Sequence, residues 1–322
     1  MLNLDLQVTE NSSKRSDFYT DVLGGLSAEN KSLPCKYFYD QRGSLLFEKI
    51  CLTDEYYVTR AELKLLKRIV GDIASRIGSE AEILEFGSGA GEKICLLLDE
   101  LQNPASYTPM DISREILSRS TLELRRRYPK LNITPWIGDY TKDLPSQLPS
   151  SNRASRRVVF FPGSTISNFT PSDAGDFLLK IRSWLGIGGV LLIGVDTIKP
   201  KAILDAAYND AQGNTAAFNL NLIHRISREL SINIDPEDFR HLAFYNEDQN
   251  RVEMYLESLR AHTIYIGDAQ IEFCKGERVH TEYSYKYSAE GFQELANSSG
   301  FRPVESWGAD REMFRFYYLE VL

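Results

Sequence analysis

Residues 83–93 read Ile-Leu-Glu-Phe-Gly-Ser-Gly-Ala-Gly-Glu-Lys, a short apolar run that leads directly into a glycine-rich loop. The apolar residues at the start fit a buried parallel strand that closes at Glu85. Gly87, Gly89 and Gly91 then remove each β-carbon that would keep a ligand away from the backbone. The stretch therefore predicts the strand, loop and helix of an α/β protein, with the loop built for a ligand.

The spacing of these glycines indicates which ligand the loop takes. A dinucleotide-binding loop has the spacing G-x-G-x-x-G, but its third glycine position, counted from Gly87, holds Glu92. An acidic residue just before a G-x-G-x-G loop is instead typical of S-adenosylmethionine (SAM) methyltransferases. Asp111 ends the next apolar run, where a carboxylate can accept hydrogen bonds from both ribose hydroxyls. The alternative is a glycine turn in another kind of α/β protein.

The composition favours a cytoplasmic enzyme over a nucleic-acid or membrane protein. The chain has 322 residues and a formal charge of −8, and its Lys and Arg residues are scattered rather than clustered for phosphate binding. No apolar run approaches the ~18–20 residues of a membrane span, and the acidic start is unlike a signal peptide. The four cysteines have neither the spacing of a zinc site nor that of a disulfide framework. We therefore expect a cytoplasmic protein without a metal, and we expect a monomer.

The order of predicted elements indicates the fold class. Strand and helix patterns alternate through the middle of the chain, which is typical of a doubly wound, mainly parallel sheet. The expected strands are 82–86, 106–110, 131–136, 157–162 and 189–195, and the expected helices are 59–77, 92–101, 113–127 and 171–185. Two strands near 302–307 and 313–321 can return to the sheet as an antiparallel hairpin. This is the Rossmann-like fold of class I SAM methyltransferases.

The remaining segments predict a second, α+β domain. We expect a methyltransferase core at 61–198 and 288–322, and a substrate-binding domain at 1–60 and 199–287. In the second domain a helix from Asp17 is expected to stop at Gly24-Gly25. Two helices are expected in 201–230, and antiparallel strands in 240–287.

Further polar residues follow the strands at the edge where α/β proteins bind ligands. Asp139 and Tyr140 suit an adenine site, with a carboxylate for the exocyclic amine beside an aromatic ring, although Asp139 could also be an ordinary turn residue. Asp196 lies at the same expected edge. The segment after the fourth strand is Phe-Pro-Gly-Ser-Thr (161–165), not the Asn-Pro-Pro-Tyr of many base and glutamine methylating enzymes. No cysteine with basic neighbours suggests a cytosine carbon-methylating enzyme.

Six longer stretches carry a family resemblance. They are 31–40 (Lys-Ser-Leu-Pro-Cys-Lys-Tyr-Phe-Tyr-Asp), 54–60 (Asp-Glu-Tyr-Tyr-Val-Thr-Arg), 84–93, 161–168 (Phe-Pro-Gly-Ser-Thr-Ile-Ser-Asn), 215–219 (Thr-Ala-Ala-Phe-Asn) and 281–284 (Thr-Glu-Tyr-Ser). Across nearly its whole length the chain resembles the histidine-specific Nα-methyltransferases of ergothioneine biosynthesis. The resemblance implies three successive methylations of the α-amino group of free L-histidine by SAM, giving hercynine.

The resemblance also implies roles for individual residues. The SAM contacts of the family fall on Tyr56, Gly87, Lys93, Asp111, Asp139 and Tyr140, to which the glycine loop adds Gly89. The groups that hold the amino and carboxylate groups of histidine fall on Tyr39, Tyr56, Gly163, Asn168 and Tyr208. The residues that contact the imidazole fall on Glu282 and Ser284, with Met254 beside them.

The residues themselves leave simpler interpretations open. Glu282 and Ser284 are two apart on an expected strand and share a face, which can be an imidazole site or a solvated surface. Tyr56 and Met254 can be core residues, and Asn168 can serve only its loop. Because an ammonium group has no lone pair, the amine must be neutral to react. We expect Tyr39 and Asn168 to orient the amine while its proton leaves through water.

Two other functions remain as alternatives. The chain could methylate another aromatic amino acid or amine, as the fungal indole-alkaloid relatives do. An indole, however, has no use for both the acceptor of Glu282 and the donor of Ser284. The chain could also be a SAM-binding subunit without turnover, but the glycine loop and Asp111 are both intact.

Overall fold

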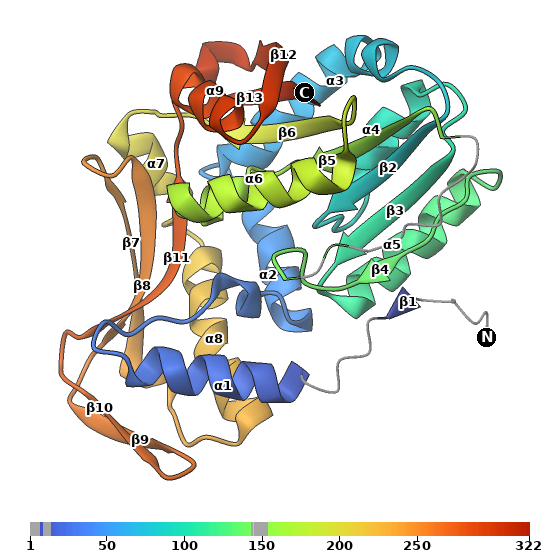
Figure 1. The fold of residues 1–322 in the computed structure, drawn as a ribbon. Helices are drawn as coiled ribbons and strands as arrows, with labels where there is room; N and C mark the ends of the chain where they lie inside the picture. Colours follow the sequence, from blue (N-terminus) through green and yellow to red (C-terminus); the bar gives the residue numbers. More distant parts are fainter. Residues whose placement is uncertain (1–6, 9–13, 143, 145–153) are drawn as a thin grey trace. The chain divides into compact units, whose positions relative to one another are not determined.

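The computed structural model divides the chain into two compact units, each built from separate stretches of sequence. It describes residues 7–8, 14–142, 144 and 154–322. The first, here called the sheet unit, comprises Val58–Ile198 and Lys286–Leu322 together with the short strand β1 (Gln7–Val8). The second, here called the inserted unit, comprises Glu10–Tyr57 and Lys199–Tyr285. Figure 1 colours both along the sequence.

The sheet unit is built on one eight-stranded sheet with the order β1-β4-β3-β2-β5-β6-β13-β12. Strands β1 to β6 pair in parallel, whereas β13 is antiparallel to both β6 and β12. The bounds are β2 (Ala81–Phe86), β3 (Ser106–Asp111), β4 (Trp136–Ile137), β5 (Arg156–Phe161), β6 (Val190–Asp196), β12 (Phe301–Gly308) and β13 (Phe314–Val321). The predicted α/β class, with a mainly parallel sheet closed by an antiparallel hairpin, is confirmed.

The helices that cover the sheet are α3 (Tyr57–Ile77), α4 (Glu92–Glu100), α5 (Arg114–Arg127), α6 (Pro171–Leu185) and α9 (Ala289–Ser298). Of these, α4, α5 and α6 follow parallel strands, whereas α3 precedes β2 and α9 precedes β12. Side chains of α6 and α9, among them Phe177 and Phe292, pack into one core with Leu84 and Phe86 of β2. Figure 1 shows α6 running across the sheet near β5. Because side chains alternate along a strand, Glu85 between these two residues points to the opposite face.

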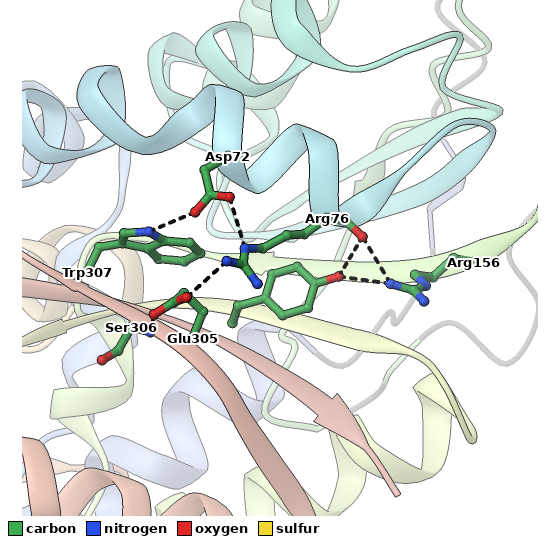
Figure 2. Close-up of polar contacts among 7 residues, drawn as sticks. Asp72, Arg76, Arg156, Glu305, Ser306 and Trp307 are labelled. Atoms are coloured by element: carbon green, nitrogen blue, oxygen red, sulfur yellow. Dashed lines mark hydrogen bonds and ion pairs between the residues drawn. The ribbon is translucent and has the colours of Figure 1, made fainter.

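Polar contacts attach α3 to the edge of the sheet formed by β12 and β13. Arg76 donates to Asp72 and to Glu305, at 3.0 and 2.9 Å, and the indole N–H of Trp307 donates to Asp72 at 3.1 Å (Figure 2). The guanidinium of Arg156 and the hydroxyl of Tyr318 donate to the backbone oxygen of Arg76. The end of α3 is therefore held by groups from three strands.

The third predicted strand is shorter than expected. The alternation across 131–136 suggests six paired residues, but only Trp136 and Ile137 form strand β4. Pro135 lacks a backbone N–H and cannot donate to a neighbouring strand, so pairing on its N-terminal side is limited to the single bridge between Tyr107 and Ile133.

The inserted unit combines helices with two small antiparallel sheets. Its strands pair in the orders β11-β8-β7 and β10-β9. The bounds are α1 (Lys14–Ser27), α2 (Gln41–Cys51), α7 (Lys201–Ala207), α8 (Asn214–Leu230), β7 (Phe239–Asn246), β8 (Arg251–Ser258), β9 (His262–Ile266), β10 (Ala269–Phe273) and β11 (Arg278–Tyr285). Helix α8 packs against α2 and β7. No helix in the described part of the chain is both long and apolar enough to cross a membrane.

The expectation that Gly24-Gly25 stops the first helix is wrong, because α1 continues through both residues to Ser27. A β-carbon on Gly25 would lie 2.0 Å from the backbone oxygen of Ser32, whose N–H donates to the Gly25 carbonyl. Gly25 is therefore required where the following chain approaches the helix closely, and not as a helix terminator.

Candidate active site

The glycine loop follows β2 and is held against the end of β3. The amides of Gly87 and Ser88 both donate to the Met110 carbonyl, at 2.9 and 3.2 Å. The amide of Gly89 donates to Oδ2 of Asp111 at 3.1 Å, and that of Ser113 donates to Oδ1 at 2.8 Å. Burial raises the pKa of the Asp111 carboxyl, and these backbone bonds partly oppose the rise. The loop and the carboxylate are thus one connected structure.

The shape of this loop suits a nucleoside ligand. Gly87 and Gly89 have φ values of +64° and +51°, a region that side chains disfavour. A β-carbon on Gly87 would meet nothing within 4 Å, so the backbone there borders open space. These features, together with the Asp111 carboxylate, fit the ribose-containing part of SAM.

Asp139 and Tyr140 follow β4. Oδ1 of Asp139 accepts hydrogen bonds from the amide and the hydroxyl of Thr141, at 3.0 and 2.5 Å, so this residue does form a turn. The ring of Tyr140 packs against Phe86 and Phe161, with centroids 5.4 and 5.7 Å apart. An aromatic ring and a carboxylate are therefore fixed beside the sheet edge, as an adenine site would need.

Glu62 connects two of the expected site residues. Its side chain is fully buried, pairs with the ammonium of Lys93, and accepts a 2.6 Å hydrogen bond from the amide of Gly163. Lys93 lies in the first turn of α4, and Gly163 follows β5 with a φ of +81°. Because its amide is engaged by Glu62, Gly163 would have to contact a ligand through other atoms.

A second buried carboxylate, Glu85, lies within β2 and does not end it. It accepts a hydrogen bond from the Tyr107 hydroxyl on the neighbouring strand. Burial raises the pKa of this carboxyl to about 8, against the lowering effects of Tyr107 and Lys93. Glu85 therefore favours its protonated form at neutral pH.

The loop after β5 carries Asn168 at the end of a short 3-10 helix (Thr165–Asn168). Ser164 anchors this loop, because its hydroxyl accepts from the Asp196 amide at 2.7 Å and contacts the Ser167 hydroxyl at 2.6 Å. Asp196, which also lies at this edge, forms a fully buried ion pair with Lys286 at 2.9 Å. Its carboxylate therefore has a structural partner within the sheet unit.

A second group of expected site residues lies in the inserted unit, in an aromatic cluster made of Tyr39, Phe47, Tyr56, Tyr208 and Phe218. Phe47 lies 5.6 Å from Tyr39 and 6.2 Å from Tyr56 between ring centroids. The Tyr56 ring lies 6.3 Å from that of Tyr208. Burial, followed by the charges of neighbours that include Tyr208, Tyr39 and Glu282, raises the pKa of the Tyr56 hydroxyl. Tyr56 therefore remains a neutral hydrogen-bonding group.

Strand β11 brings Glu282 and Ser284 to this cluster. Their exposed fractions are 9% and 5%, so the interpretation as a solvated strand face is wrong. The Tyr208 hydroxyl donates to the Ser284 hydroxyl at 2.7 Å. Met254 is directly opposite Glu282 in the register of β8 and β11 and is also buried. Glu282, Ser284 and the aromatic cluster thus form one connected group.

The expected site residues fall into two sets, one in each unit. The sheet unit holds Gly87, Gly89, Lys93, Asp111, Asp139, Tyr140, Gly163 and Asn168, and the inserted unit holds Tyr39, Tyr56, Tyr208, Met254, Glu282 and Ser284. Glu62 is absent from the sequence-based set. Its signal is a carboxylate on the apolar side of a helix, because Leu65, Leu66 and Ile69 share its face at three-, four- and seven-residue spacings.

Comparisons with known proteins agree on one family. A family model described as "Histidine-specific methyltransferase, SAM-dependent" matches residues 18–321. The chain is 36% identical to a histidine N-alpha-methyltransferase of Mycolicibacterium smegmatis, covering 89% of each chain. It is 35% identical to a protein of the same name from Mycobacterium tuberculosis, again covering 89% of each. Ergothioneine biosynthesis protein 1 of Neurospora crassa is 32% identical over 86% of this chain and 32% of its own length.

Proposed function

The chain belongs to the SAM-dependent histidine-specific methyltransferases, and on that premise we propose that it converts free L-histidine to hercynine by three methylations of the α-amino group. It is an enzyme that uses SAM to methylate histidine. The position of the methyl groups and their number are the proposed part. The names of the mycobacterial relatives support the α-amino position, and the fungal relative supports a place in ergothioneine biosynthesis.

The observation that carries the substrate assignment is the buried group around Glu282 and Ser284. Imidazole offers one N–H donor and one acceptor nitrogen, and a carboxylate with a hydroxyl can match both. The Tyr208 hydroxyl donates to the Ser284 hydroxyl, which holds Ser284 in this group, and we assign Ser284 as the donor to imidazole. An indole has only a donor and would leave one of these buried groups unpaired, which disfavours indole substrates strongly.

We assign the cofactor role to the sheet unit. Gly87, Gly89 and Asp111 would hold the ribose end of SAM. Asp139 with Tyr140 would hold the adenine. Lys93, which is paired with Glu62, would contact the carboxylate of SAM. Tyr56 is assigned a further contact from the inserted unit. When bound, SAM would supply a methyl group attached to a positively charged sulfur: the amine nitrogen would bond to the methyl carbon as the carbon–sulfur bond breaks, and the neutral thioether would leave without acid catalysis.

The remaining task for the protein is to present a neutral amine. We propose that Tyr39 and Asn168 orient the amino group, and that Tyr56, Tyr208 and Gly163 hold the amino acid. Since burial keeps the Tyr56 hydroxyl neutral, this group offers a hydrogen bond without a competing charge. The amine proton leaves through water, and positioning provides most of the rate enhancement.

We also propose that the enzyme works as a cytoplasmic monomer that binds no nucleic acid. The scattered basic residues and the net charge of −8 support the last point. Four free cysteines, Cys35, Cys51, Cys95 and Cys274, fit a reducing compartment. Light scattering coupled to size exclusion tests the oligomeric state against the 36.7 kDa chain mass.

The test is a mass-spectrometric assay of the purified protein with SAM and a panel of free amino acids. We expect histidine alone to gain up to three methyl groups, with all of them on the α-nitrogen by fragmentation. In the E282A variant, kcat/KM for histidine should fall at least about a hundredfold while the Kd for SAM stays within about twofold. Methylation of tryptophan or tyrosine in place of histidine would contradict the assignment. An equal loss in kcat/KM for histidine and in SAM affinity would contradict the assignment of Glu282 to the imidazole site.

A further inference from the structure

The stretch 215–219 carries family resemblance and supplies Phe218 to the aromatic cluster, but its last residue, Asn219, has no role in the site described above. Asn219 ends this stretch on α8 and is fully buried. Its side-chain amide donates to the backbone oxygen of Tyr255 and faces Nδ1 of His241, both at 2.9 Å. The other ring nitrogen of His241, Nε2, lies 3.0 Å from the backbone oxygen of Tyr208. Asn219 and His241 thus link α8 and β7 to a residue of the proposed histidine site.

These contacts determine the protonation state of His241. A backbone oxygen can only accept, so the Asn219 group facing Tyr255 must be its NH₂. The same NH₂ faces Nδ1 of His241, which must therefore accept and carry no proton. Nε2 faces another backbone oxygen and must donate. His241 is consequently the neutral tautomer with its proton on Nε2.

The chain of hydrogen bonds continues into the substrate site. Tyr208 is the C-terminal cap of α7, where backbone oxygens lack partners within the helix. His241 supplies a donor there, which fixes the backbone from which the Tyr208 side chain extends. The hydroxyl of Tyr208 then donates to Ser284 at 2.7 Å. A movement of Tyr208 would therefore shift its ring relative to the ring of Tyr56, and it would also change the hydrogen bonding of Ser284.

We propose that His241, oriented by Asn219, is a positioning residue for histidine recognition: it holds Tyr208 so that Tyr208 and Ser284 meet the substrate in one fixed geometry. The proposal rests on the proposed function, specifically on the roles of Tyr208 and Ser284 in binding histidine. It predicts a defect chiefly in the use of the amino acid substrate, because Tyr208 and Ser284 are assigned to histidine, whereas the sheet-unit residues are assigned to SAM.

The geometry also predicts a pH dependence. A proton on Nδ1 would face the NH₂ of Asn219, two donors in opposition, so protonation must break the link. Burial lowers the pKa of His241 and keeps the ring neutral near pH 7. The carboxylate of Asp210, held by the amides of Asn214 and Thr215, is the charged neighbour that opposes this lowering. Histidine binding should therefore weaken as the pH falls toward the lowered pKa of His241.

The test compares three variants in steady-state kinetics with histidine and SAM varied separately. H241A removes the donor to Tyr208, and we expect the KM for histidine to rise about tenfold with kcat and the Kd for SAM within about twofold. H241Q retains an acceptor and a donor but cannot titrate, so it should keep a KM close to wild type at pH 7.5. The control is N209A, which removes a different link between the turn after α7 and β7: the side chain of Asn209 donates to the Ala243 oxygen at 3.2 Å and to the Asp205 oxygen of α7 at 2.7 Å.

The pH arm uses the ratio of wild-type to H241Q KM, because titration of the substrate cancels in that ratio. We expect the ratio to rise as the pH is lowered from 7.5 to 5.5. Ring-nitrogen NMR at pH 7 should show a neutral Nε2–H tautomer for His241. The chain has four histidines, and the signals of His241 are those that disappear in H241Q. An Nδ1–H tautomer, a flat ratio, or a histidine KM equally raised in N209A would overturn the inference.

The outcomes separate this inference from the proposed function. A wild-type protein that does not methylate histidine would overturn the proposed function before any variant is compared. A wild-type protein that does methylate histidine, together with an H241A variant of unchanged KM, would overturn the inference alone. Thermal unfolding of each variant identifies a general loss of stability, which would lower kcat and SAM binding as well.

Discussion

Glu62 illustrates how one buried charge can serve two segments of a site. A carboxylate is rarely buried without partners, because loss of hydration costs several kcal/mol. Here Lys93 supplies a countercharge and the Gly163 amide supplies a hydrogen bond at 2.6 Å. Glu62 therefore fixes a residue assigned to SAM and one assigned to the amino acid.

The E62Q variant separates the charge from the hydrogen bond. Glutamine can still accept from Gly163, but Lys93 loses its ionic partner and, being about a quarter exposed, can turn toward solvent. We expect the Kd for SAM to rise about tenfold in calorimetric titration, the effect of losing one charge-assisted contact.

The matched control for E62Q is E82Q, which alters a buried carboxylate paired with Arg157 at 3.4 Å near the start of β2. Both variants should lose stability, but E82Q should bind SAM within about twofold of wild type. Equal weakening of SAM binding in the two variants would mean that Glu62 acts only through general stability.

Glu85 predicts a pH dependence of stability. Its pKa is about 8 in the folded protein, above the ordinary value of the unfolded chain. The folded state therefore binds the extra proton, and its contribution to stability is complete below about pH 4.5 and is lost as the pH rises toward 8. E85Q, which keeps an acceptor for Tyr107 without the charge, should become more stable relative to wild type between pH 5.5 and 8.5. Chemical denaturation of the ligand-free protein measures this, and a constant difference across the range would contradict it.

At the scale of a single helix, Thr170 caps the start of α6. Its side chain accepts from the Asp173 amide at 3.2 Å, and Pro171 occupies the first helical position. T170A should lower the free energy of unfolding by about 1 kcal/mol in urea titration, since a helix N-terminal amide loses its partner. T170S keeps the hydroxyl and should restore most of that loss. If T170S were as unstable as T170A, the loss of stability would come from the missing methyl group and not from the missing hydroxyl.

Elements with strong local signals were predictable from sequence, and those decided by distant contacts were not. Strand β2 leads directly into the glycine loop, and helix α6 has a clear start signal and apolar residues at helical spacing; both lie within one residue of the expected bounds. Gly25 looks like a helix terminator until Ser32 is seen to pack against it. The backbone pairing expected for 131–136 is interrupted at Pro135, although the residues before it alternate between apolar and polar as in a strand.

At the scale of the whole molecule, the sequence predicted that the glycine loop and Asp111 lie at one edge of the sheet, because consecutive parallel strands bring their ends together there. The hydrogen bond between them was found only in the structure. No comparable rule predicts which residues of the inserted unit lie close together. Tyr56, Tyr208 and Ser284 are far apart in sequence, and simple periodicity assigns each of them to a core or a surface. Only the family resemblance and then the fold brought them into one group, and Glu62 and His241 required the structure.

The division of labour between the units predicts two patterns of hydrogen exchange. SAM should slow exchange most in the glycine loop and around Asp111, whereas histidine should slow it most in β11 near Glu282 and Ser284. The β9–β10 hairpin should be unaffected by either ligand and serves as the internal control. Mass spectrometry of peptides reads all three regions, and maximal protection of the same peptides by both ligands would contradict the division.

The pairing of β6 with β13 has a consequence for synthesis on the ribosome. Every residue of β6 is buried, and one of its edges pairs only with β13, which is translated after the whole Lys199–Tyr285 stretch of the inserted unit. The nascent chain therefore displays an apolar strand with an open edge while more than a quarter of the protein is still being made. Such a strand is a natural substrate for chaperones, and the yield of active enzyme should depend on them more than its final stability suggests.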